Sequence, residues 1–118
     1  MIFKKPADVR YTDMAIWIDE NAYLDDCDNV QLYEYLFHLV NMLAHRGCYF
    51  DTNAEYEDFS LSVANKLFLR LRNPKQAILI EGSGKTKLPQ IKSILNYIKR
   101  TIYPAKMDYE RDRTTKTS

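Results

Sequence analysis

The chain lacks the residues and runs that mark several large protein classes. It has only two cysteines and two histidines in 118 residues, and Cys27 and Cys48 do not form the CxxC spacing of a metal or redox site. No stretch approaches the ~18 consecutive apolar residues of a membrane span, and residues 1–6 are too few for a signal peptide. We therefore expect a cytoplasmic protein with reduced thiols and no metal or cofactor.

The chain also lacks a convincing catalytic constellation, so we do not expect an enzyme. His38 and His45 lie seven residues apart on one predicted helix, and only Cys48 lies close enough in sequence to add a third metal ligand. We interpret both histidines as partly exposed helix residues. The segment Ile78–Thr86 ends in Gly-Ser-Gly-Lys-Thr like a phosphate-binding P-loop, but Leu79 stands where that motif requires its first glycine.

Apolar periodicity predicts four helices. A chain of 118 residues and 13.9 kDa can bury one modest core, and apolar residues recur at three- and four-residue steps in four segments. The predicted helices are a short one capped by Thr12 and three longer ones at Val30–His45, Tyr56–Leu71 and Leu88–Pro104. We predict that Asn29 caps the second helix, and that Asn73-Pro74 and Pro104 end the third and fourth.

These helices predict an all-α fold in a single domain over residues 1–107. Its architecture is a small orthogonal bundle of three main helices plus a short N-terminal helix. Residues 108–118 are charged and are predicted to form a disordered C-terminal tail.

The acidic and basic residues are segregated along the chain. Residues 7–58 contain twelve aspartates and glutamates against Arg10 and Arg46, whereas residues 59–106 contain ten lysines and arginines against Glu81. The two stretches therefore carry charges of 2 − 12 = −10 and 10 − 1 = +9. Such a split indicates either two surfaces with separate electrostatic roles or two halves that attract each other within the fold.

Aromatic and cationic residues are interleaved in the last predicted helix. Aromatic rings can stack on unpaired bases while neighbouring cations hold phosphates. The candidate nucleic-acid-binding residues are Lys92, Asn96, Tyr97, Lys99, Arg100, Tyr103 and Lys106. The alternative is a solvated basic helix face with two tyrosines at its boundary.

The order of the helices resembles region 2 of bacterial sigma factors over roughly residues 30–106. The segment LYEYLFHLVNMLAHR is followed by NKLFLRLRN and then by IKSILNYIKRTIY. Asn65–Leu71 is similar to the end of the family helix that grips RNA polymerase, and Leu95–Arg100 is similar to the start of the helix that melts and reads promoter DNA. Ser62 and Lys66 stand where the family has acidic residues.

The resemblance implies a small transcription factor of the kind that tailed phages encode, acting in the host cytoplasm. Its partners would be single-stranded or melted DNA and, as a further partner, RNA polymerase. The residues expected to contact the polymerase are Asn65, Lys66, Leu69 and Arg70. The alternative from another class is a phage structural, assembly or adaptor protein. Its acidic and basic halves would then meet across copies of the chain or bind other virion proteins.

Overall fold

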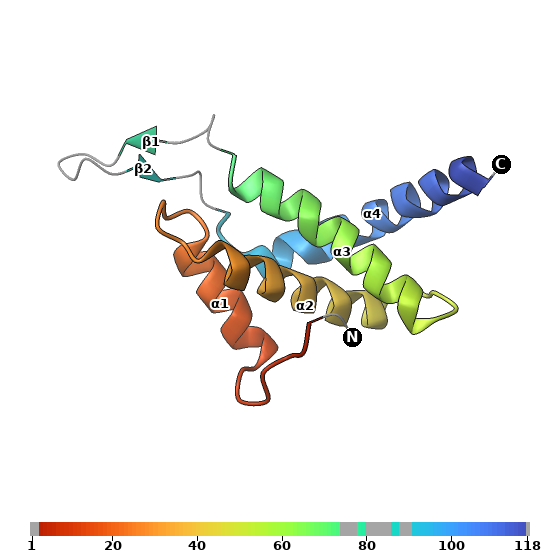
Figure 1. Ribbon diagram of the computed structural model, residues 1–118, viewed down its shortest axis with the longest axis horizontal. Helices are drawn as coiled ribbons and strands as arrows, with labels where there is room; N and C mark the ends of the chain where they lie inside the picture. Colours follow the sequence, from red (N-terminus) through yellow and green to blue (C-terminus); the bar gives the residue numbers. More distant parts are fainter. Residues whose placement is uncertain (1–2, 74–77, 80–85, 88–90, 118) are drawn as a thin grey trace.

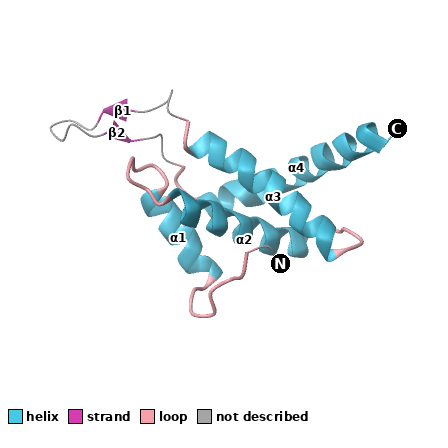
Figure 2. Cartoon of the chain, viewed as in Figure 1, coloured by secondary structure: helices cyan, strands magenta, loops and turns pink. Residues whose placement is uncertain are grey.

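Four helices and a short hairpin make up the parts of the chain that a computed structural model describes, residues 3–73, 78–79, 86–87 and 91–117 (Figures 1 and 2). The helices are α1 (Tyr11–Asn21), α2 (Asn29–Gly47), α3 (Asn53–Leu71) and α4 (Ile94–Thr117). Strand β1 (Ile78–Leu79) pairs antiparallel with β2 (Thr86–Lys87). The predicted all-α bundle of three main helices and a short N-terminal helix is confirmed. The Gly-Ser-Gly-Lys loop lies outside the described residues.

The core surrounds α2, which packs against all three other helices. Figure 1 shows α2 and α3 side by side, with α1 crossing one end of α2. Phe37 of α2 and Phe59 of α3 are both fully buried, and each contributes about 1.5–3 kcal/mol by leaving water. The apolar stripes that the sequence predicts therefore face one another and form a single core.

The helix starts differ from the predicted ones by a few residues. Asp28, rather than Asn29, caps α2, because its carboxylate accepts two N–H groups of the first turn, both at 3.1 Å. Thr12 lies inside the first turn of α1 and is not its cap. Residues 91–93 are not helical, so α4 begins later than the predicted start near Leu88.

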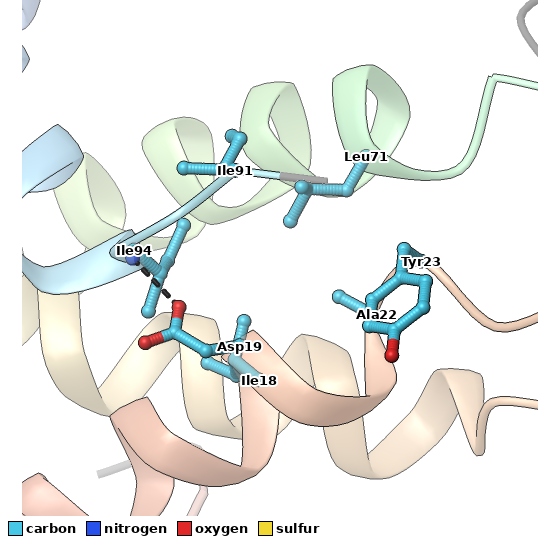
Figure 3. A pocket seen from close by; sticks show the side chains of 7 residues that line it. All are labelled: Ile18, Asp19, Ala22, Tyr23, Leu71, Ile91 and Ile94. Atoms are coloured by element: carbon cyan, nitrogen blue, oxygen red, sulfur yellow. Dashed lines mark hydrogen bonds between the residues drawn. The ribbon is translucent and has the colours of Figure 1, made fainter. Parts of the chain in front are cut away.

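The start of α4 is fixed to α1. The Asp19 carboxylate of α1 accepts the N–H of Ile94 at 2.8 Å (Figure 3), while Ser93 Oγ accepts the N–H of Asn96 at 3.3 Å. Burial raises the pKa of Asp19, and the hydrogen bond from Ile94 opposes that rise. The cavity beside this contact measures about 10 Å³. It has room for about one water molecule and for no larger ligand.

The prediction that Pro104 ends the last helix is wrong, because α4 continues through Pro104 to Thr117. Pro104 has no N–H, so the helix loses the hydrogen bond to the carbonyl of Arg100 at that turn. The buried stripe nevertheless continues: Tyr109 packs on the rings of Phe50 and Phe59, with centroids 5.8 and 5.4 Å away. The charged tail predicted from residue 108 therefore begins within α4, and helical backbone continues to Thr117, where α4 projects away from the bundle (Figure 1).

Arg72, just after α3, joins the acid-rich and the basic stretches of the chain. Its guanidinium donates to the carbonyl oxygens of Ala22, Leu24 and Asp25 at 2.9, 2.6 and 3.2 Å. These carbonyls belong to the end of α1 and the α1–α2 loop, where a helix leaves acceptors unsatisfied and favours a cation. Arg72 is therefore a structural residue, although it counts toward the basic half.

Candidate nucleic-acid interface

The outward face of α3 carries the four candidate partner-binding residues. Asn65, Lys66, Leu69 and Arg70 are all exposed, and Leu69 is 62% exposed despite being apolar. They occupy this face because Val63, Leu67 and Leu71, on the opposite side of the helix, are buried in the core. The structure therefore groups the four residues on one accessible surface, which we call the α3 face.

A contact between Arg70 and Tyr97 links the α3 face to α4. The guanidinium carbon of Arg70 lies 5.3 Å from the centroid of the Tyr97 ring, within the range of a cation–π interaction. Tyr97 is half-buried. One side of its ring is therefore occupied by Arg70, so Tyr97 is less available for stacking than the sequence suggested.

Four of the candidate nucleic-acid-binding residues gather around one surface hollow. Lys92 precedes α4, and Asn96, Lys99 and Arg100 follow in its first two turns. Together with Ile91 and Ser93 they line an open concavity of about 500 Å³, which we call the basic hollow. All four side chains are exposed, because the buried stripe of α4 runs through Ile94, Ile98 and Ile102.

The cations of the basic hollow have no carboxylate partner among the residues that the structure describes. Within the part of the chain that the structure describes, Lys92, Lys99 and Arg100 form no ion pair with a carboxylate. The same holds for Lys66 and Arg70 of the α3 face. These five side chains are exposed, and attraction to the described carboxylates of the acidic half does not account for their positions.

The two remaining candidates, Tyr103 and Lys106, do not line the basic hollow. Tyr103 lies farther along α4 and is 63% exposed. The Lys106 side chain is only 19% exposed and pairs with Glu110 at 3.6 Å, and its ammonium lies 5.9 Å from the Phe50 ring centroid. Lys106 is thus directed toward the bundle and is already paired with a carboxylate.

The structure adds two cations that sequence reasoning did not assign to the site. Arg10 and Arg46 line a second cavity, of about 290 Å³, together with Lys99. We call it the α1–α2–α4 pocket, because α1, α2 and α4 each contribute residues to it. Arg10 and Arg46 are the only two lysines or arginines among residues 7–58. Their isolation among acidic residues is the one sequence feature that could have marked them as candidate site residues.

Burial shifts the pKa of one histidine and of both cysteines. His38 is buried rather than partly exposed as predicted, and no described residue forms a hydrogen bond with its Nε2. Burial, followed by the charge of Lys5, lowers the pKa of His38. Burial raises the pKa of both thiols, Cys27 and Cys48, which disfavours the reactive thiolate. No three His, Cys, Asp or Glu side chains among the described residues are grouped to hold a metal ion.

Comparisons with protein-family models, curated proteins and solved structures find no match for this chain. The described helices include none with the length and apolar content needed to cross a bilayer. The resemblance to sigma factor region 2 therefore rests on short sequence motifs alone.

Proposed function

We propose that this chain binds single-stranded or melted DNA through the basic hollow, as a small helical transcription factor resembling region 2 of sigma factors. The observation that supports this proposal is the grouping of Lys92, Lys99 and Arg100 around one concavity, where none of the three pairs with a carboxylate of the described residues. Phosphate neutralisation by such cations supplies most of the affinity of proteins for nucleic acids.

The residues around the hollow have complementary roles in this proposal. Lys92, Lys99 and Arg100 hold the phosphates of the strand. Asn96 offers an amide that can donate to and accept from a base edge. Outside the hollow and farther along α4, the exposed ring of Tyr103 stacks on an unpaired base of the same strand, which contributes about 1–3 kcal/mol per stacked base.

The proposal predicts a measurable dependence on salt. Neutralising three phosphates of a single strand gives a slope of about −2 for the logarithm of the association constant against the logarithm of salt concentration. Raising salt from roughly 50 to roughly 200 mM then weakens binding by about 20-fold. Fluorescence anisotropy with a labelled oligothymidine measures both values. A native chain that does not bind at the lower salt concentration would remove the proposal.

Charge reversal within the hollow tests the site itself. We expect Lys99→Glu combined with Arg100→Glu to weaken binding at least about tenfold, because it removes two phosphate contacts and adds repulsion. The control is Lys4→Glu combined with Arg111→Glu, which changes net charge equally at exposed cations outside the hollow. Equal loss of affinity in both double variants would mean that net charge, and not the hollow, determines binding.

We further propose that the α3 face contacts RNA polymerase. An exposed leucine flanked by cations that form no ion pair within the described residues suits a protein interface, and Leu69 supplies the apolar centre. Leu69→Asp is expected to reduce recovery of polymerase from host lysate by the tagged chain without changing its affinity for oligothymidine. Unchanged recovery of polymerase would exclude this face.

The second candidate is an assembly protein whose copies, or whose virion partners, join through opposite charges. Asp25 and Asp26 favour it, because they are exposed on the α1–α2 loop and have no ion pair among the described residues. These carboxylates of one copy would meet the basic hollow of the next, head to tail. Sedimentation velocity without nucleic acid separates the candidates: salt-sensitive oligomers support assembly, and a monomer at all salt concentrations excludes self-assembly.

A further inference from the structure

The α1–α2–α4 pocket differs in chemistry from the basic hollow beside it, although both contain Lys99. Its wall is apolar and is formed by Met42, Leu43 and Leu95 together with the half-buried ring of Tyr11. The basic hollow, by contrast, is lined mainly by charged and polar side chains. The pocket therefore offers an apolar contact surface that the hollow lacks.

The rim of this pocket is cationic from three directions. Arg10 precedes α1, Arg46 lies in the last turn of α2, and Lys99 lies in α4. Arg46 and Lys99 have no carboxylate partner among the described residues, and Arg10 has a long contact of 3.4 Å to Asp13. Like charges repel one another, so an anion bound at the rim would reduce the electrostatic repulsion among these three cations.

The pocket is poorly suited to a nucleobase. None of the described residues that line it has an amide or carboxylate side chain, and their hydroxyl groups are those of Tyr11 and Thr12. A base edge would therefore find few partners for its hydrogen bonds. The Lys5 ammonium also lies over the Tyr11 ring, 5.1 Å from its centroid. It therefore covers one face of the ring, on which a base could otherwise stack. These features separate the pocket from the proposed DNA surface.

We infer that the α1–α2–α4 pocket binds an anionic amphiphile, namely a carboxylate carried on a short apolar body. The apolar body lies against Leu43 and Leu95, and the carboxylate is held by Arg46 and Lys99, with Arg10 alongside. A guanidinium pairs with both oxygens of a carboxylate through its planar fork. The volume of about 290 Å³ lies at the lower end of the ~300–1,000 Å³ typical of ligand sites, which fits a small ligand.

Octanoate is a direct probe of this inference. We expect it to cause saturable shifts in the backbone amide resonances of Thr12, Arg46 and Lys99 in two-dimensional nitrogen–proton NMR spectra. Octanamide, which keeps the apolar body without the charge, and acetate, which keeps the charge without the body, are each expected to bind at least about tenfold more weakly. Equal binding of octanamide or acetate, or saturable shifts centred elsewhere, would overturn the inference.

A matched pair of variants assigns the site. Arg46→Gln combined with Lys99→Gln is expected to weaken octanoate binding at least about tenfold, because both charge-assisted hydrogen bonds are lost. Lys92→Gln combined with Arg100→Gln removes the same charge from the basic hollow and is expected to leave octanoate affinity unchanged. Equal effects of the two double variants would overturn the assignment to the pocket.

The carboxylate can come from a free small molecule or from an acidic, apolar segment of a protein, and a second titration separates these sources. Its probe is the capped peptide acetyl-Leu-Glu-Phe-Glu-Leu-amide. Saturable binding of octanoate alone assigns a free ligand, and binding of the peptide alone assigns a protein segment. Binding of both supports the pocket chemistry, and binding of neither overturns it.

Occupancy of the pocket has a consequence that rests on the proposed function. Because Lys99 lines both cavities, a carboxylate bound there competes with a phosphate, so saturating octanoate is expected to weaken oligothymidine binding several-fold. The two proposals fail separately. Binding of octanoate without binding of DNA would exclude the proposed function and support the ligand site in the pocket. Binding of DNA alone would exclude the ligand site.

Discussion

Replacing Arg72 should destabilise the whole bundle, because one guanidinium holds three backbone carbonyls of the α1–α2 connection. Two of these hydrogen bonds, to Ala22 and Leu24, are partly buried, and the third is exposed. A hydrogen bond to a charged group contributes about 1.5–3 kcal/mol when it is protected from water. Taking the lower value for the two partly buried bonds, we expect Arg72→Met to reduce the free energy of unfolding by about 3 kcal/mol.

Urea unfolding followed by far-ultraviolet circular dichroism measures this loss. With a denaturant slope of about 1.5 kcal/mol per molar, the midpoint should fall by about 2 M. The urea midpoint of Arg72→Lys should lie between those of Arg72→Met and the native chain, because a single ammonium cannot reproduce the fork of the guanidinium. Arg46→Met is the matched control: Arg46 is exposed and unpaired among the described residues, so its loss should cost less than about 0.5 kcal/mol. Coinciding midpoints for the two methionine variants would refute the reasoning.

Two further perturbations concern the buried His38 and the half-buried Tyr109. The pKa of His38 lies below its ordinary value of 6.5 in the folded chain, so the unfolded chain binds the proton more readily; stability should be fully present above about pH 6.5 and fall as pH drops below it. Urea midpoints measured between about pH 5 and 8 should show this decline in the native chain and in His45→Gln, and a smaller decline in His38→Phe. Tyr109→Ser should lower the free energy of unfolding by about 1–3 kcal/mol, because two edge-to-face ring contacts are lost. An unchanged urea midpoint in Tyr109→Ser would show that the end of α4 does not contribute to the bundle.

The helices were predictable because apolar periodicity is local information. Phe59, Val63 and Leu67 recur at helical spacing in the sequence, and all three are buried on the core side of α3. The end of α4 was not predictable in the same way. Pro104 disfavours a helix locally, whereas the contacts of Tyr109 with Phe50 and with Asp58 of α3 depend on residues more than fifty positions away. Tertiary packing therefore outweighs the local preference of Pro104, and α4 remains helical through that turn.

The candidate site was only partly predictable for the same reason. Asn96, Lys99 and Arg100 share one face of a helix, so their grouping follows from spacing alone. The i to i+4 pairing of Lys106 with Glu110 could also have been inferred, had the helix been extended past the proline. The contact between Arg70 and Tyr97, by contrast, depends on how α3 crosses α4, and no local pattern specifies that crossing.

The positive charge around Lys99 is greater than the charge of the basic stretch alone would indicate. Arg10 and Arg46, the two exceptions in the acid-rich stretch, both lie at its pocket, whereas Arg72 of the basic stretch is occupied by carbonyls. A DNA strand confined to the basic hollow meets three cations and gives a salt slope of about −2, but a strand that also crosses the α1–α2–α4 pocket meets five and gives about −3.5. A slope near −3.5 that returns toward −2 in Arg10→Gln combined with Arg46→Gln would show that bound DNA crosses the pocket. A slope near −2 in both proteins would show that bound DNA contacts only the basic hollow, so that a ligand in the pocket competes with DNA at Lys99 alone.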